Sequence, residues 1–286
     1  MTLTSIDTAT LALSAARARR HVLRMFAAAG SGHLGGAFSC LDMVTALYSR
    51  VLKIDPADPE SPDRDRFLLS AGHKALAQYA VLAEHGFFDL DELDTYGDRG
   101  SHLPGHPDMH KLAGVEGNTG ALGHGTAIAA GMALGAKIDG RDYRVFTILG
   151  DGELPEGSNW EAFAAAAHHG LDNLVAVIDH NDFQISGSVG EIMNMHSIAD
   201  KMRAFGWAVR EIDGHNFEQM MDAFTSTPFE PGKPSAILAH TVKGQGISAI
   251  AGRIESHYWS PSDAELAAAV AETDTLIEQL AREVTR

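Results

Sequence analysis

The fold is decided by residues 143–152, which read Tyr143-Arg144-Val145-Phe146-Thr147-Ile148-Leu149-Gly150-Asp151-Gly152. The apolar, β-branched part of this run predicts a buried parallel strand that ends just before Asp151. A second such run, residues 173–179, precedes Asn181, and an alanine-rich helix over 156–170 is predicted between them. Since a strand–helix–strand unit is right-handed, both strands end at the same edge of the sheet. We therefore expect Asp151 and Asn181 to lie close together.

These two side chains predict a metal site. Carboxylate and amide oxygens suit Mg²⁺ or Ca²⁺, and Mg²⁺ usually takes the rest of its ligands from water and substrate phosphates. Gly150 and Gly152 lack a Cβ, so the backbone around Asp151 allows a diphosphate to approach closely. A Gly-Asp-Gly triplet by itself is a common turn, so the prediction depends on the whole spacing.

The chain resembles the transketolases, and in particular the amino-terminal subunit of two-chain transketolases. The motifs that carry the resemblance are Gly150-Asp151-Gly152-Glu153-Leu154-Pro155-Glu156-Gly157, Trp160-Glu161-Ala162, Leu171-Asp172-Asn173-Leu174 and Asp179-His180-Asn181-Asp182-Phe183-Gln184-Ile185-Ser186-Gly187. The resemblance implies thiamine diphosphate and Mg²⁺ (or Ca²⁺) as cofactors. It also implies that the backbone carbonyl of Phe183 joins Asp151 and Asn181 as a metal ligand.

Four histidines lie in loops near predicted element ends and extend the resemblance over nearly the whole chain. They are His33, His73, His106 and His257. A single loop histidine is usually structural, and these spacings do not match a structural zinc site. The resemblance implies that His33 and His257 contact substrate hydroxyls and the reacting side of the cofactor. It places His73 near the diphosphate and His106 at the terminal hydroxyls of the sugar donor.

The resemblance assigns four further positions. Gly120 and Leu122 match positions that flank the cofactor, while Gly152 and Glu156 match positions near the diphosphate and the catalytic centre, respectively. The usual Pro-Leu-Gly-Gln-Gly pattern reads Ala121-Leu122-Gly123-His124-Gly125 here. His124 is therefore either an extra polar contact or a substitution without consequence.

Composition limits the other functions that this chain could have. With 22 Lys and Arg against 38 Asp and Glu, the net charge of −16 argues against nucleic acid or an anionic membrane as a partner. The single cysteine, Cys40, is expected to be buried and suits a cytoplasmic protein. The sequence has no apolar run of membrane-spanning length, and the order of apolar and basic residues near the N-terminus is the reverse of a secretory signal.

The remaining pattern predicts an α/β fold, a doubly wound parallel sheet with helices on both faces. Helices are expected at 5–29, 39–49, 75–85, 120–137, 197–205, 216–227 and from 263, and further strands at 65–70, 207–212 and 235–240. Residues 95–117 form a long loop of the kind that is usually functional or mobile. We expect residues 1–286 to make one diphosphate-binding domain.

The resemblance also implies that half of the active site is missing from this chain. In transketolases a second domain binds the aminopyrimidine ring and supplies a glutamate to it. The residues after Asn181 complete the first sheet instead, so we expect a partner chain to carry the pyrimidine-binding half, with two copies of each chain. The implied reaction transfers a two-carbon ketol unit from a ketose to an aldose, both of them phosphorylated sugars by default.

Three other interpretations remain open. The chain could belong to a related thiamine diphosphate enzyme, such as a deoxyxylulose-phosphate synthase or a ketoacid dehydrogenase component. It could also be a non-catalytic subunit that retains the fold. A nicotinamide-binding fold is weaker, because no Gly-x-Gly-x-x-Gly follows a predicted strand with an acidic residue about 20 positions on.

Overall fold

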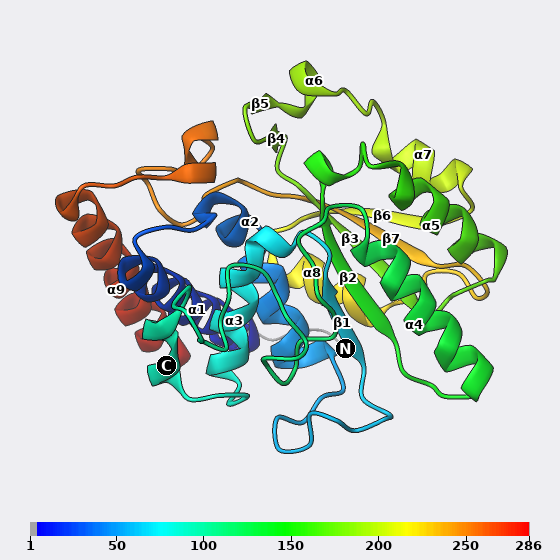
Figure 1. The fold of residues 1–286 in the computed structure, drawn as a ribbon, viewed down its shortest axis with the longest axis horizontal. Helices are drawn as coiled ribbons and strands as arrows, with labels where there is room; N and C mark the ends of the chain where they lie inside the picture. Colours follow the sequence, from blue (N-terminus) through cyan, green and yellow to red (C-terminus); the bar gives the residue numbers. More distant parts are fainter. Residues whose placement is uncertain (1–4, 286) are drawn as a thin grey trace.

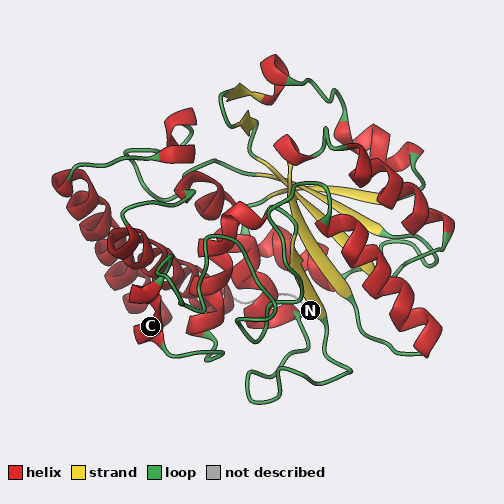
Figure 2. Cartoon of the chain, viewed as in Figure 1, coloured by secondary structure: helices red, strands yellow, loops and turns green. Residues whose placement is uncertain are grey.

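The computed structural model describes residues 5–285, and the side chains of residues 7–285. Its centre is a parallel sheet of β1 (Arg66–Leu69), β2 (Val145–Gly150), β3 (Leu174–His180), β7 (Ser235–His240) and β6 (Ala208–Asp213), in the order β1-β2-β3-β7-β6 (Figures 1 and 2). A short antiparallel hairpin, β4 (Phe183–Gln184) with β5 (Gly187–Ser188), follows β3 and was not predicted. The predicted parallel sheet is confirmed.

Helices cover both faces of this sheet, as the sequence predicts. One layer contains α1 (Ser5–Ala29), α2 (Leu34–Ala46), α3 (Ala75–Glu84) and α8 (Phe217–Thr225), with α9 (Asp263–Val284) packed along α1 (Figure 1). The other layer contains α4 (Gly125–Asp139), α5 (Gly157–His168) and α7 (Ile198–Ala204). No helix within residues 5–285 combines the length and the apolar character that a bilayer crossing requires.

Strand alternation explains why the sheet has two apolar cores. In β2, Phe146 and Ile148 belong to the core under α1, α2 and α3, whereas Val145 and Leu149 belong to the core under α4 and α5. Burying one such side chain stabilises the fold by about 1.5–3 kcal/mol. Because β2 is buried on both faces, its sequence is a nearly continuous apolar run.

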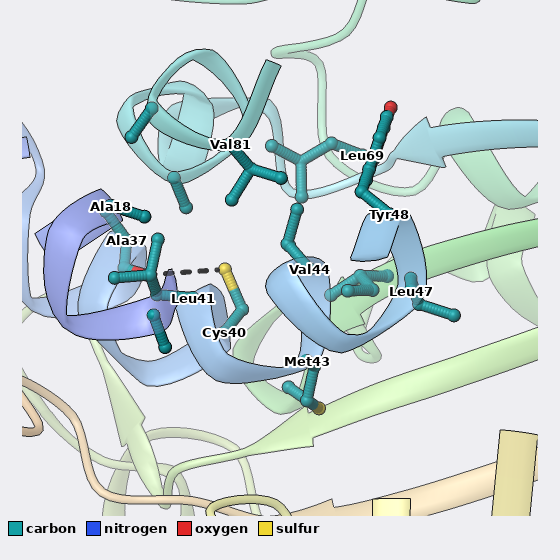
Figure 3. Packing of buried hydrophobic residues seen from close by; sticks show 14 of the residues in the cluster. Ala18, Ala37, Cys40, Leu41, Met43, Val44, Leu47, Tyr48, Leu69 and Val81 are labelled. Atoms are coloured by element: carbon teal, nitrogen blue, oxygen red, sulfur yellow. Dashed lines mark hydrogen bonds between the residues drawn. The ribbon is translucent and has the colours of Figure 1, made fainter. Parts of the chain in front are cut away.

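Cys40 lies in the first of these cores, as predicted. It packs among the apolar side chains of α2, close to Ala37, Leu41 and Val44, and its Sγ lies 3.5 Å from the Ala37 carbonyl oxygen (Figure 3). Burial raises the pKa of the Cys40 thiol to about 12. The thiol is therefore protonated and inert at neutral pH.

Two helix starts differ from the prediction, and glycine accounts for both. α2 begins at Leu34, not Ser39, because Gly35 and Gly36 are helical despite their low propensity. α4 begins at Gly125, not Gly120, because Gly120 (φ +142°) and Gly123 (φ +83°) adopt backbone conformations that a right-handed helix excludes. Residues 120–124 are therefore a loop.

Candidate active site

A cavity of about 410 Å³ opens at the carboxyl ends of β2 and β3, the edge where open α/β sheets bind ligands. Most of the predicted site residues line it: His73, Leu122, Asp151, Gly152, Glu156, Asn181, Phe183 and His257. His33, His106 and Gly120 are absent from its lining. The structure thus gathers residues that are far apart in the sequence.

The predicted metal ligands meet in this cavity. The Asp151 carboxylate is almost fully buried and accepts hydrogen bonds from the backbone N–H groups of Gly152 (2.8 Å) and Asp182 (2.6 Å). Burial, with the nearby Asp179 carboxylate, raises the pKa of Asp151 to about 7. A Cβ on Gly152 would lie 3.4 Å from the Phe183 carbonyl oxygen, so this oxygen lies beside the Gly-Asp-Gly turn.

The structure adds a second possible donor set that the sequence analysis did not name. Ligand atoms of Asp151, His180 and Asp182 lie within 4.8 Å of one another. Asp151 belongs to both sets, so either arrangement would hold a divalent ion at the ends of β2 and β3.

The four loop histidines form one cluster. The ring of His33 lies 5.4 Å from that of His73, 5.2 Å from that of His257 and 6.3 Å from that of His106, measured between centroids. Gly120 is needed beside them, since a Cβ there would lie 2.9 Å from Cδ2 of His106.

Three of these rings are neutral at physiological pH. Burial lowers the pKa of His33, and that of His73 well below its usual value, while burial and the Lys243 ammonium lower the pKa of His257 to about 4. A neutral imidazole both donates and accepts a hydrogen bond. The cluster therefore offers the groups that polyhydroxylated ligands need.

A buried ion pair that the sequence analysis missed supports the floor of the cavity. The Lys74 ammonium donates to Asp179 Oδ2, which also accepts from the Ser39 hydroxyl at 2.5 Å, while Thr241 donates to Oδ1. Burial opposes both charges, but their mutual attraction raises the pKa of Lys74 and lowers that of Asp179. The sequence did not mark Asp179 as a supporting residue, because it follows a run of apolar strand residues and its partners are far away along the chain.

Lys243 is a second missed cation, and it lines the cavity. The residue is 3% exposed, and no carboxylate of the described residues lies within ion-pair distance of its ammonium. Burial, together with the Lys74 charge, lowers the pKa of Lys243 to about 8. The position after a strand end, in Thr241-Val242-Lys243-Gly244, was the available sequence signal.

Glu153 is the third missed residue, and it joins three segments beneath the cavity. Its carboxylate accepts hydrogen bonds from the Ser70 hydroxyl (2.5 Å), the Gly123 N–H (2.8 Å) and the Gly150 N–H (3.2 Å). Glu153 thus fixes the ends of β1 and β2 and the loop before α4. It follows Asp151 by two positions, but its contacts are not visible in the sequence.

The chemistry of the cavity fits a diphosphate bound with a metal ion. Buried cations without a carboxylate partner are costly unless an anion binds them, and Lys243 is such a group. The buried Nδ1 of His257 has no hydrogen-bond partner among the described residues. Asp151, Lys243 and His257 therefore line one cavity with a buried carboxylate and, within the described part of the chain, an ammonium without an ion-pair partner and an imidazole whose Nδ1 has no hydrogen-bond partner.

Comparisons with known proteins agree with this site. A family model described as the thiamine diphosphate binding domain of transketolase matches residues 11–273. The chain is 41% identical over 274 residues to an apulose-4-phosphate transketolase subunit from Phocaeicola vulgatus, and the match covers 96% of this chain and 97% of the relative. It is 43% identical over 256 residues to the 6-deoxy-6-sulfo-D-fructose transketolase subunit SqwG of a Clostridium species, with 90% and 93% covered.

Solved structures show the same fold. Transketolase from Leishmania mexicana superposes with a TM-score of 0.83 at 29% identity, and the match covers 99% of this chain but 46% of the longer one. The chain thus spans just under half of that transketolase. On these matches and on the cavity above, the chain belongs to the transketolase family and carries its thiamine diphosphate-binding domain.

Proposed function

We propose that this chain is the diphosphate-binding subunit of a transketolase that depends on thiamine diphosphate and Mg²⁺. The reaction transfers a two-carbon ketol unit from a ketose phosphate to an aldose phosphate. The observation that carries the proposal is the meeting of Asp151, Asn181 and the unpaired Lys243 in one cavity at the carboxyl ends of the sheet. Ca²⁺ is the alternative ion, because the same oxygen ligands suit it.

The residues have distinct roles in this proposal. Asp151, Asn181 and the Phe183 carbonyl hold the metal, and Lys243, His73 and the unpartnered His257 Nδ1 bind the diphosphate. Gly120, Leu122 and Gly152 shape the walls against the cofactor. Bound thiamine diphosphate supplies the carbanion that adds to a ketose carbonyl and stabilises the transferred fragment.

The histidines act on the sugar. His33 and His257 orient substrate hydroxyls and exchange protons with the oxygen of the reacting carbonyl, while His106 binds the terminal hydroxyls of the donor. Glu156 lines the cavity at the start of α5 and lies on the side of the catalytic centre. Neutral imidazoles suit this proton transfer, because each can both donate and accept a proton.

A second chain completes the active site in this proposal. Two relatives that match along nearly their whole length are named as transketolase subunits, and the chain spans under half of a one-chain transketolase. We therefore assign residues 1–286 to one domain and the pyrimidine-binding half to a partner, with two copies of each. The single buried cysteine favours a cytoplasmic location.

The test uses the chain with and without its partner. Calorimetric titration with thiamine diphosphate and Mg²⁺ is expected to show binding that D151A and N181A each weaken by at least about a hundredfold, since even groups behind a metal ligand are worth 10–100-fold. NAD⁺ is expected to give no binding. Equal binding by the variants and the unchanged chain would refute the proposed metal site.

The donor substrate separates transketolase from its relatives. With the partner present, we expect turnover with hydroxypyruvate or a ketose phosphate and none with pyruvate, while the isolated chain turns over little. Turnover of pyruvate would identify a deoxyxylulose-phosphate synthase or ketoacid dehydrogenase type. Absence of turnover with every donor, despite cofactor binding, would identify a non-catalytic subunit.

A further inference from the structure

Two histidines face each other at the last register pair of β3 and β7. His180 and His240 are Cα partners, and their Nδ1 atoms lie 3.2 Å apart. Their rings are 5.1 Å apart and nearly perpendicular, at 77°. Solvent reaches the pair, since the side chains of His180 and His240 are 22% and 52% exposed.

The other nitrogen of each ring faces a carboxylate. His180 Nε2 lies 3.3 Å from Asp182 Oδ1, and His240 Nε2 lies 3.2 Å from Glu211 Oε2. A carboxylate accepts hydrogen bonds, so Glu211 favours the ring proton of His240 on Nε2, and the nearby Asp182 carboxylate favours the same tautomer of His180. In that tautomer both Nδ1 atoms carry lone pairs, which a cation between them would satisfy.

We propose that His180 and His240 form a binding site for a divalent transition metal of the zinc class. Two nitrogens bound to a tetrahedral zinc ion, each about 2.0–2.1 Å from it, lie roughly 3.3–3.4 Å apart. The observed separation of 3.2 Å is close to this spacing. Water completes the coordination, since the pair is open to solvent.

The groups around His180 and His240 favour a bound metal ion over a single proton shared between the two Nδ1 atoms. Histidine ligands of metals typically donate their second N–H to a carboxylate, which orients the ring and increases its basicity. Asp182 and Glu211 occupy these two positions. The Arg203 guanidinium lies 3.9 Å from Glu211 Oε1 and offsets part of this negative charge.

This site adjoins the proposed Mg²⁺ site, because ligand atoms of Asp151, His180 and Asp182 lie within 4.8 Å of one another. The ligand that distinguishes the two sites is His240, which is the last residue of β7, the neighbour of β3, and belongs to the His180 pair alone. Imidazole ligands suit zinc, copper and nickel, whereas Mg²⁺ prefers oxygen. The two sites therefore select different ions.

The experiment titrates Zn²⁺ into the chelator-treated chain in the presence of saturating Mg²⁺ and thiamine diphosphate. A colorimetric chelator reports the free Zn²⁺. The unchanged chain is expected to bind one more equivalent of Zn²⁺ than H240Q. E211Q is expected to keep this equivalent but to bind it at least about tenfold more weakly, because it removes the carboxylate behind His240.

His168 and His169, at the carboxyl end of α5, provide a matched control. His168 and His169 also have nearly perpendicular rings, 4.9 Å apart at 75°, but no carboxylate of the described residues lies within ion-pair distance of either ring. H168Q/H169Q is expected to bind Zn²⁺ as the unchanged chain does. Equal zinc binding by H240Q and the unchanged chain would overturn the proposal, and so would loss of the same equivalent in the control. Cu²⁺ paramagnetic resonance, expected to show two nitrogen ligands, provides an independent readout.

Discussion

The buried ammonium of Lys243 lowers the stability of the fold and, in the proposed function, is available to bind the diphosphate. Its ammonium is buried beside a second cation, Lys74, and this lowers its pKa to about 8. The unfolded chain holds the same proton up to about pH 10.4. Between these values the unfolded state binds more protons than the folded state, so stability rises as the pH increases through this window.

Replacing this residue separates stability from binding. K243M removes the buried charge, and we expect the ligand-free chain to gain roughly 2–3 kcal/mol at pH 7, or a few degrees in melting temperature. Binding of thiamine diphosphate should weaken at least tenfold. For the unchanged chain this affinity should also fall as the pH rises through about 8, because the ligand-free Lys243 loses its proton. A variant that is both less stable and fully able to bind would contradict this account.

The candidate site residues were easier to name from the sequence than the residues that pack and bond beneath them. Asp151, Asn181 and the loop histidines stand beside glycine or at strand ends, where a sequence pattern marks them. Glu153 bonds to Ser70 and Gly123, which lie 83 and 30 positions away, and also to a nearby backbone N–H group. Lys74 bonds to Asp179, which lies 105 positions away. Such pairings depend on tertiary structure, so the sequence alone left them unassigned.

The start of helix α2 was also not predictable from the sequence, because it depends on tertiary packing. Gly35 packs against the 3₁₀ turn Ile254–Tyr258, which carries His257, and a Cβ on it would lie 2.7 Å from the Ser256 carbonyl oxygen. The Gly35 carbonyl also accepts a hydrogen bond from the Gly244 N–H at 3.0 Å. Close packing, not helix propensity, therefore requires glycine here, which is why the predicted start at Ser39 was wrong.

G35A tests this packing. Alanine should favour the helix by about 1 kcal/mol, but the contact with the Ser256 backbone cannot be relieved by rotating a side chain. We expect a net loss of roughly 1–3 kcal/mol in urea unfolding and weaker cofactor binding, since His257 is displaced. G190A, in the helical turn Val189–Ile192 with open space around its Cα, is the control and should be neutral. Unchanged stability of G35A would show that the turn moves freely.

At the scale of the molecule, a buried polar network joins the first helix to the segment that carries Lys243. Asp42 accepts from Arg19 Nη2 at 3.0 Å and from His215 Nδ1 at 2.9 Å. The Val242 N–H donates to His215 Nε2 at 2.9 Å, and Arg19 Nε donates to the Gln245 carbonyl at 3.1 Å. Both ends of residues 242–245 are therefore anchored to the layer of α1 and α2.

D42N breaks this network at its centre. Arg19 then stays buried without a counterion, which costs about 3–5 kcal/mol, and the Lys243 segment loses its support. The control is D274N, which removes an ion pair of the same 3.0 Å length, to the neighbouring Arg20, but on the exposed surface. It should cost about 0–1 kcal/mol. Similar urea midpoints for D42N and D274N would contradict the proposed role of the network.

The sheet and its two helical layers could be predicted because apolar periodicity is local. The network could not, because it depends on how α1, α2 and the segment after β7 pack together. The same reasoning explains the missed β4–β5 hairpin, whose strands have two residues each and leave no periodic signal.

The bond between Arg19 and Gln245 also has a consequence for biosynthesis. These residues are 226 positions apart, which a ribosome adding 5–20 residues per second separates by roughly 10–50 s. Residues 150–152 are therefore translated at a stage when the segment that carries Lys243 cannot yet be anchored to Arg19. In the proposed function, a competent cofactor site therefore forms only after residue 245 has been translated, so the cofactor cannot guide the folding of the residues before it.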